Sequence, residues 1–153
     1  KKLWFMNAKS MKKSDLLFTK VIPNLSQIDT LYELLKQRSD NISHAIIPSF
    51  EEHQSFVEDH PYRAWYILSR KDSPIGSVYL TNENSIGINI KDSFDAHELE
   101  IILEFIQLNY SPLPQIKSIR RKDFHVNVSP DNHNLLDCLQ RLDMKKIQST
   151  YLI

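Results

Sequence analysis

The stretch RAWYILSRKDSPIGSVYLTNENSIGINI, residues 63 to 90, decides the fold of this chain. It holds three runs rich in β-branched and aromatic residues, over 63–70, 75–82 and 86–90, joined by the short polar connections KDSP and ENS. Such runs, bounded by turn residues, predict strands. Because connections this short join strands that run in opposite directions, we expect a three-stranded antiparallel meander.

The segments around the meander alternate between helical and strand patterns. We expect Ser26 to cap the first helix, and Ser49 with Glu52 has the spacing of a capping box at the second. The expected strands outside the meander are 16–22, 122–128 and 145–153, and the expected helices are 27–38, 49–60, 95–110 and one that starts at 129–132. This order predicts a single α+β domain with a mixed, mostly antiparallel sheet of about six or seven strands flanked by helices.

Composition places the chain among ordinary globular proteins. Its 153 residues are enough for one domain, and 41% of them are hydrophobic and 25% charged. Nineteen basic residues balance nineteen acidic ones, so no global charge favours nucleic acid or an anionic membrane. No apolar run reaches the ~18 residues of a membrane helix. We therefore expect no nucleic-acid partner and no membrane association.

The cysteine and histidine content predicts no metal site. One cysteine, Cys138, excludes an internal disulfide and a four-cysteine zinc site. The six histidines show no H-x-x-x-H spacing on a helix. A lone thiol is compatible with a reducing compartment, and we expect a cytoplasmic protein. Residues 1–14 are expected to form a poorly ordered extension before a domain that spans 15–153.

Three segments resemble the GNAT superfamily of N-acetyltransferases. Residues 77–90, SVYLTNENSIGINI, resemble the family's pair of central strands. Residues 126–153 resemble its closing strand, helix and strand, and residues 48–68 resemble the second helix and following strand of members that act on amino sugars. The resemblance implies the family's fold and the transfer of an acetyl group from acetyl-CoA, as co-substrate, to a primary amine of a small molecule such as an amino sugar. A homodimer is compatible with it.

The resemblance also implies where acetyl-CoA would bind. The backbone of Ile88, Asn89 and Ile90 matches the strand that pairs with the pantetheine arm in the family, and Asn132 matches a residue that reaches toward that arm. Asn132 has an alternative interpretation as the cap of the helix that follows it. Arg120 and Arg121, in a basic run, are candidates for a phosphate contact or are part of a solvated loop.

One stretch departs from the family pattern. GNAT members carry a Q/R-x-x-G-x-G/A motif before the long helix, where backbone N–H groups bind the pyrophosphate of CoA. The matching residues here, Asp95 to Glu100, contain no glycine and no basic residue, and Asp95 with Glu98 has the spacing of a capping box. We therefore predict a degenerate pyrophosphate loop with weakened or altered CoA binding.

Two functions stay open at this point. The first is an acyl-CoA-dependent N-acyltransferase, and the second is a GNAT-fold protein that has lost acetyl-CoA binding and acts as a binding or regulatory module. Ser85 and Leu139 stand where many members carry a catalytic Glu and a catalytic Tyr. The remaining candidates for acid–base catalysis are Glu52, His53 and His125, with solvated or structural roles as the alternative.

Overall fold

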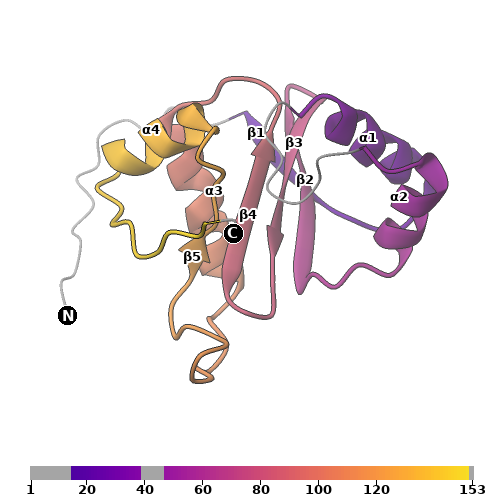
Figure 1. The fold of residues 1–153 in the computed structure, drawn as a ribbon. Helices are drawn as coiled ribbons and strands as arrows, with labels where there is room; N and C mark the ends of the chain where they lie inside the picture. The colour runs from indigo at the N-terminus through magenta and orange to yellow at the C-terminus, as the bar shows by residue number, and fades with distance from the viewer. Residues whose placement is uncertain (1–14, 39–46, 152–153) are drawn as a thin grey trace.

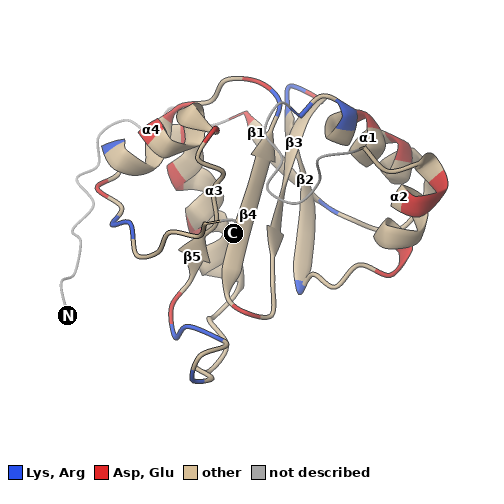
Figure 2. Ribbon diagram, in the orientation of Figure 1, with Lys and Arg blue, Asp and Glu red and all other residues tan. Residues whose placement is uncertain are grey.

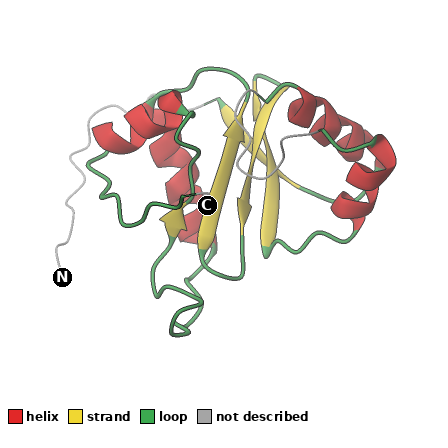
Figure 3. Cartoon of the chain, viewed as in Figure 1, coloured by secondary structure: helices red, strands yellow, loops and turns green. Residues whose placement is uncertain are grey.

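The computed structural model describes residues 15–38 and 47–151 of the chain. The element order is β1 (Leu16–Lys20), α1 (Leu25–Lys36), α2 (Phe50–Glu58), β2 (Ala64–Arg70), β3 (Ser73–Leu80), β4 (Ser85–Ile90), α3 (Ala96–Asn109), β5 (His125–Val126) and α4 (His133–Arg141). The extension expected over 1–14 lies outside the described residues. Figures 1 and 3 show one sheet between two helical layers, with α1 and α2 on one side and α3 and α4 on the other.

The sheet has five strands in the order β1-β2-β3-β4-β5. The strands β1 to β4 are antiparallel neighbours and β5 runs parallel to β4, so the predicted meander and the mixed α+β sheet are confirmed. Trp65 of β2 pairs with Tyr79 of β3, and Tyr79 pairs with Gly87 of β4. Because side chains alternate along strands, this row faces α1 and α2, whereas Ile86 and Ile88 face α3.

The number of strands is lower than predicted, and the difference lies near the C-terminus. The strand expected over 122–128 is reduced to the two residues of β5, and residues 145–151, the described part of the last expected strand, form none. A strand is stable when it pairs with neighbours and buries one face. Ile147 and Tyr151 are 54% and 84% exposed, so the apolar side chains of this segment do not pack against the rest of the protein.

Capping side chains set where the helices begin. Ser49 and Glu52 form the predicted capping box of α2, in which the Ser49 N–H donates to the Glu52 carboxylate at 2.8 Å. The cap predicted for α1 is wrong, because Asn24 rather than Ser26 accepts the N–H of Gln27, at 3.0 Å. Asn and Ser are equally good caps, so the path of the chain after β1 decides between them.

Two apolar clusters fill the space between the sheet and the helices. The larger one joins the sheet to α3 and α4, and its fully buried members include Leu68, Val78, Leu80, Leu99, Ile102 and Ile106. The smaller one joins the other face to α1 and α2 through Val21, Ile28, Leu31, Val57, Trp65 and Ile67. No helix in the described ranges is both long enough and apolar enough to cross a bilayer.

Asn84, in the turn between β3 and β4, fastens the segment that leads into β5. It is fully buried and has a φ of 63°. Its amide nitrogen donates to the carbonyls of Leu113 and Arg121, both at 2.8 Å, and its amide oxygen accepts the Leu113 N–H at 2.8 Å. Its own carbonyl accepts the His125 N–H at 3.1 Å. One residue therefore ties the loop after α3 to the start of β4.

Gly87 leaves room on β4 for the ring of Tyr79. A Cβ atom at residue 87 would lie 2.0 Å from Cζ and 2.4 Å from the hydroxyl oxygen of Tyr79. The tip of this phenol therefore rests on the β4 backbone. The Tyr79 ring is also stacked on Tyr62, with the ring centroids 4.1 Å apart, so it has little freedom to move aside.

Replacing Asn84 with Ala should lower the free energy of unfolding by about 2 kcal/mol or more, because buried groups of the loop lose their hydrogen-bond partners. Asn84→Gly removes the amide but adopts the positive φ without strain. Comparison with Asn84→Ala therefore separates the cost of the lost hydrogen bonds from the cost of the backbone conformation. Glu83→Ala, at an exposed position of the same turn, should change stability by less than about 0.5 kcal/mol. Urea denaturation measures all three. An Asn84→Ala variant as stable as the parent would contradict the anchoring role.

Gly87→Ala should cost about 1–3 kcal/mol of stability, because the added methyl group displaces the Tyr79 ring. In a Tyr79→Ala background the same change should cost less than about 0.5 kcal/mol, since the clash is gone. Thermal or chemical unfolding of the four proteins in this cycle gives the coupling energy. Additive effects of the two changes would mean that the contact between residue 87 and the Tyr79 ring is not the cause.

Candidate functional site

The strands β4 and β5 pair over two residues and then separate. Ser85 is opposite His125 and Ile86 is opposite Val126. The Asn127 N–H donates to the Ile86 carbonyl at 3.3 Å, and this is the last bond that joins the two segments. Beyond it the chain leads from β5 into α4, away from β4, as Figure 1 shows. The C-terminal half of β4 is therefore left without a strand neighbour on this side, within the described chain.

The backbone of β4 alternates between its two neighbours. The Ser85 carbonyl accepts the Thr81 N–H, and the Lys91 N–H donates to Ile75, both at 2.9 Å, so the odd-numbered residues bond toward β3. By alternation, the N–H and C=O groups of Ile88 and Ile90 face away from β3. No strand pairing to β5 reaches either residue. We call these outward-facing groups the open β4 edge.

Polar side chains from β4 and β5 lie on the α1 and α2 side of this edge. The Asn127 amide donates to the Ser85 hydroxyl at 2.7 Å. His125 belongs to the same row of β5 as Asn127, and its Nδ1 is buried without a hydrogen-bond partner. The structure thus places His125 opposite Ser85, the position where the family resemblance places a catalytic Glu, three residues before Ile88.

The start of α3 is held by two carboxylates. Asp95 accepts the Glu98 N–H at 2.9 Å, and the Asp95 N–H donates to Glu98 at 3.4 Å, so the predicted capping box is confirmed. Arg70, the last residue of β2, forms a bidentate ion pair with the same Glu98 carboxylate, with nitrogen–oxygen distances of 2.8 to 3.0 Å. A negative group at a helix N-terminus is electrostatically favourable, so this arrangement stabilises the fold.

Phe94, the residue before this cap, is hydrogen-bonded to side chains of α4. The Asn134 amide donates to the Phe94 carbonyl at 3.1 Å and accepts the Phe94 N–H at 3.5 Å. The Cys138 thiol lies 3.6 Å from the same carbonyl. Burial raises the pKa of Cys138, which keeps the thiol protonated at its place in the core. We call Phe94 to Glu98, with these partners, the α3 entrance.

Asn132 is the N-cap of α4. Its side chain accepts the Leu135 N–H at 3.1 Å, which supports the capping interpretation left open above. The acceptor capacity of its side-chain oxygen is therefore partly used inside the protein. Its proposed contact with a pantetheine arm stays a prediction.

Glu52 and His53 lie on α2, and the structure places both in structural contacts. The Glu52 carboxylate accepts the Ser49 N–H. His53 is 6% exposed, and its Nε2 lies 3.3 Å from the Ile28 carbonyl of α1. Burial lowers the pKa of His53, so its ring is kept neutral. Neither residue contacts the open β4 edge through any hydrogen bond, and their catalytic roles stay predictions.

Arg120 and Arg121 lie at the opposite end of β4 from the α3 entrance. The Arg120 guanidinium donates to the carbonyls of Asn82 at 2.6 Å and Pro114 at 3.0 Å, and Arg121 donates to Gln148 at 3.1 Å. Figure 2 shows the Lys and Arg residues of this loop at the far end of the sheet from the start of α3. The structure therefore does not bring them together with the helix terminus that would bind a pyrophosphate.

An aromatic cluster covers the sheet beside Gly87. It consists of Phe56, His60, Tyr62, Trp65 and Tyr79. Their rings meet edge to face, except that Tyr62 and Tyr79 are stacked and His60 is tilted against Tyr62. The Nε1 of Trp65 and the Nδ1 of His60 are buried without hydrogen-bond partners. The positive charge of Arg38, just after α1, acts to lower the pKa of both stacked tyrosines, against the larger effect of burial, which raises it. Sequence reasoning missed Arg38, because a basic residue after a helix end is an ordinary surface pattern.

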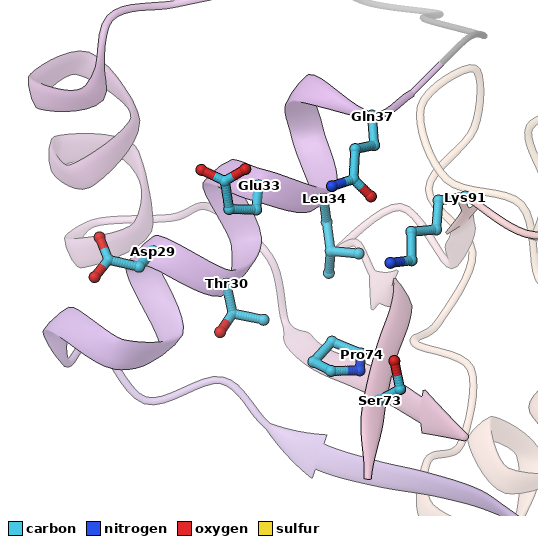
Figure 4. A pocket seen from close by; sticks show the side chains of 8 residues that line it. All are labelled: Asp29, Thr30, Glu33, Leu34, Gln37, Ser73, Pro74 and Lys91. Atoms are coloured by element: carbon cyan, nitrogen blue, oxygen red, sulfur yellow. The ribbon is translucent and has the colours of Figure 1, made fainter. Parts of the chain in front are cut away.

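Two open cavities lie near the ends of the sheet. The first, of about 310 Å³, has residues of α1 on one side and Ser73, Pro74 and Lys91 on the other (Figure 4). The second, of about 330 Å³, lies between the end of α3 and the loop before β5 and is lined by Gln107, Tyr110, Ser111, Pro112, Asp123 and Phe124. Among the described residues no group of three or more His, Cys, Asp or Glu side chains is placed to hold a metal ion.

Comparison with known proteins finds similarity in structure only. No family model and no curated protein matches the sequence. A domain from Methanocaldococcus jannaschii DSM 2661 is similar in structure, with a TM-score of 0.59, 15% identity, and 88% of this chain and 91% of that chain covered. A possible acetyltransferase from Clostridium difficile 630 gives a TM-score of 0.53 at 11% identity, covering 90% of this chain and 95% of that one.

The aminoglycoside N-acetyltransferase AAC(6')-Iy, solved in complex with CoA, is a third similar structure. It gives a TM-score of 0.57 at 14% identity, with 95% of this chain and 97% of that chain covered. Identities this low show the fold alone. They show that this chain has the fold of the GNAT acetyltransferases.

Proposed function

We propose that this protein is an acyl-CoA-dependent N-acyltransferase that acetylates a primary amine of a small molecule, an amino sugar being one candidate. The observation that carries the proposal is the open β4 edge, which leaves the backbone groups of Ile88 and Ile90 free of strand partners. An extended amide chain such as pantetheine pairs with such an edge as a strand would, without needing particular side chains. The similarity in fold to a CoA-bound acetyltransferase supports the same assignment.

The reaction needs few groups from the protein. The amine nitrogen attacks the thioester carbonyl, a carbon–nitrogen bond forms, the carbon–sulfur bond breaks and CoA leaves as the thiolate. The open β4 edge supplies N–H donors that stabilise the negative charge on the carbonyl oxygen. We propose His125 as the group that takes the amine proton, directly or through water, because it lies opposite Ser85, where the family resemblance places a catalytic Glu, and has an unpartnered buried nitrogen.

A second candidate function follows from the α3 entrance. In this proposal the chain has lost acetyl-CoA binding and acts as a binding or regulatory module. It is favoured by the capping box of Asp95 and Glu98, whose carboxylates occupy the helix terminus where a pyrophosphate would bind. At ~4–6 Å, like charges repel by a few kcal/mol under partial screening. The degenerate loop therefore weakens CoA binding in the first proposal and abolishes it in the second.

Calorimetric titration with acetyl-CoA separates the two functions. The enzyme proposal expects weak but measurable binding, with a dissociation constant in the high micromolar to millimolar range. No binding at millimolar acetyl-CoA would remove it in favour of the binding module. Tight binding would instead contradict the proposed effect of the two carboxylates.

Replacing residues 95–100 with Gln-Gly-Lys-Gly-Leu-Gly should strengthen acetyl-CoA binding and lower the melting temperature. Binding should improve because N–H donors are freed, three carboxylates are removed, a Lys replaces His97 and Arg70 loses its Glu98 partner. Stability should fall because the capping box is lost and each added glycine costs about 0.5–1 kcal/mol relative to Ala. Calorimetry and thermal unfolding measure the two effects.

Asp95→Ala is the matched control for this exchange. It removes the cap, at a cost of about 0.5–2 kcal/mol, but adds no glycine or Lys. Its CoA affinity should stay closer to that of the parent than to that of the exchanged protein. If the exchange lowers the melting temperature and leaves CoA affinity unchanged, the α3 entrance is not what limits binding.

A further inference from the structure

The open β4 edge is closed at one end and leads into the α3 entrance at the other. At the closed end β5 pairs with Ser85 and Ile86, and the Asn127 N–H donates to the Ile86 carbonyl. At the other end β4 stops at Ile90, and α3 begins at Ala96. A ligand chain paired along the edge therefore extends past Ile90, toward the α3 entrance.

This direction places the two ends of a thioester donor. The reacting end lies toward the closed end of the edge, where His125, the proposed acceptor of the amine proton, is opposite Ser85. The far end of an extended donor then lies beyond Ile90, beside the α3 entrance. In acyl-CoA that far end is the nucleotide, which carries a pyrophosphate and a 3′-phosphate, whereas the pantetheine arm is uncharged. The α3 entrance therefore decides whether the nucleotide contributes to binding.

The hydrogen-bonding groups that would bind a phosphate are already used at the α3 entrance. The N–H groups of Phe94, Asp95 and Glu98 donate to the side chains of Asn134, Glu98 and Asp95, at 3.5, 3.4 and 2.9 Å. The Arg70 guanidinium makes three contacts of 2.8 to 3.0 Å with the Glu98 carboxylate, and the two side chains of this pair are only 32% and 21% exposed. A phosphate group would have to displace these bonds.

The charge of this segment also opposes a phosphate. The ten residues 91–100 hold one basic and four acidic side chains, those of Lys91, Asp92, Asp95, Glu98 and Glu100. The helix terminus favours an anion, but the carboxylates of Asp95 and Glu98 already supply it. Further negative charge near these carboxylates is repelled. The nucleotide of acyl-CoA therefore adds repulsion at this end of the donor instead of contacts.

We propose that this protein recognises the pantetheine arm of its donor and selects against the nucleotide, so that its donors are acyl thioesters of pantetheine that lack the nucleotide. Asp95 and Glu98 are the residues that set this specificity. The proposal rests on the proposed acyl transfer and adds the chemical class of the donor. Acyl-CoA is then the poorer donor, because its arm binds the same edge while its phosphates meet carboxylates.

Calorimetry without an acceptor compares acetyl-CoA, acetyl-pantetheine and adenosine 3′,5′-bisphosphate, which represents the nucleotide alone. At low salt acetyl-pantetheine should bind at least as tightly as acetyl-CoA, and the nucleotide alone should not bind at about 1 mM. In a site built for CoA, each charged hydrogen bond to a phosphate would add about tenfold or more in affinity. Tighter binding of acetyl-CoA than of acetyl-pantetheine, or binding of the nucleotide alone, would overturn the proposal.

The salt dependence of binding gives the sign of the interaction with the phosphates. Raising the salt from about 0.02 M to about 0.3 M shortens the screening distance from about 20 Å to about 6 Å. The affinity for acetyl-CoA should then rise, because repulsion is screened, and that for acetyl-pantetheine should stay unchanged. An affinity for acetyl-CoA that falls with salt would mean that cations bind its phosphates, against the proposal.

Two variants that keep the helix cap locate the specificity. Asp95→Asn removes a charge and leaves an equally good cap, so the melting temperature should stay close to that of the parent. Glu98→Gln retains a residue type suited to the capping box and releases Arg70. Each should raise the affinity for acetyl-CoA about threefold or more, the size of one exposed ionic interaction, and leave that for acetyl-pantetheine unchanged.

Glu104→Gln is the matched control for these variants. It makes the same change of charge at an exposed position of α3, six residues beyond Glu98 and so about 9 Å farther along the helix. It should leave the ratio of the two affinities unchanged. An unaltered ratio in both Asp95→Asn and Glu98→Gln, or an equal change in Glu104→Gln, would overturn the assignment to the α3 entrance.

Acetyl transfer to glucosamine and other primary amines separates failure of this inference from failure of the proposed function. Transfer from acetyl-CoA with a higher kcat/KM than from acetyl-pantetheine would leave the acyltransferase standing and reject the proposed donor class. Selective binding of acetyl-pantetheine that depends on Asp95 and Glu98, with no transfer to any amine, would leave the donor specificity standing and reject the acyltransferase. Binding of neither thioester would reject both.

Discussion

The buried amide of Asn84 is the constraint on which the geometry of the site depends. This amide donates to the carbonyls of Leu113 and Arg121, and the backbone carbonyl of Asn84 accepts the N–H of His125. These bonds fix where β5 starts beside β4. β5 pairs with Ser85 and Ile86, and after the bond from the Asn127 N–H to the Ile86 carbonyl the chain leaves β4. The open β4 edge is the direct result, since a strand that stayed paired would have used the outward groups of Ile88 and Ile90.

At the other end of β4, folding and ligand binding make opposite demands on the same atoms. The N–H groups at the start of α3 need acceptors, and a helix terminus favours negative charge whether it comes from a side chain or from a ligand. Here Asp95 and Glu98 meet that need, and Arg70 neutralises Glu98. The entrance is therefore stable without a ligand. A loop with free donors would be less stable alone and would gain its stability on binding phosphate.

On the face of the sheet that α1 and α2 cover, some buried polar groups have no hydrogen-bond partner among the described residues. Its rings pack well, but Arg38, His60, Trp65 and His125 each keep a buried nitrogen without a partner. Buried polar groups are nearly always hydrogen-bonded in folded proteins, so these four nitrogens are exceptions among the described residues. The two regions thus differ. The polar groups of the α3 entrance have hydrogen-bond partners within the protein, whereas several buried nitrogens on the face beside Gly87 have none.

The sequence by itself determined the features that depend on near neighbours. The meander follows from three apolar runs and two short turns, and the capping boxes at Ser49 and Asp95 follow from a spacing of three residues, because such contacts form within one turn of helix. The tertiary structure alone decided the strand count, the choice of Asn24 as a cap and the ion pair of Arg70 with Glu98. These outcomes join residues far apart in the chain, and only the packing of whole elements selects among partners that local sequence leaves equally good.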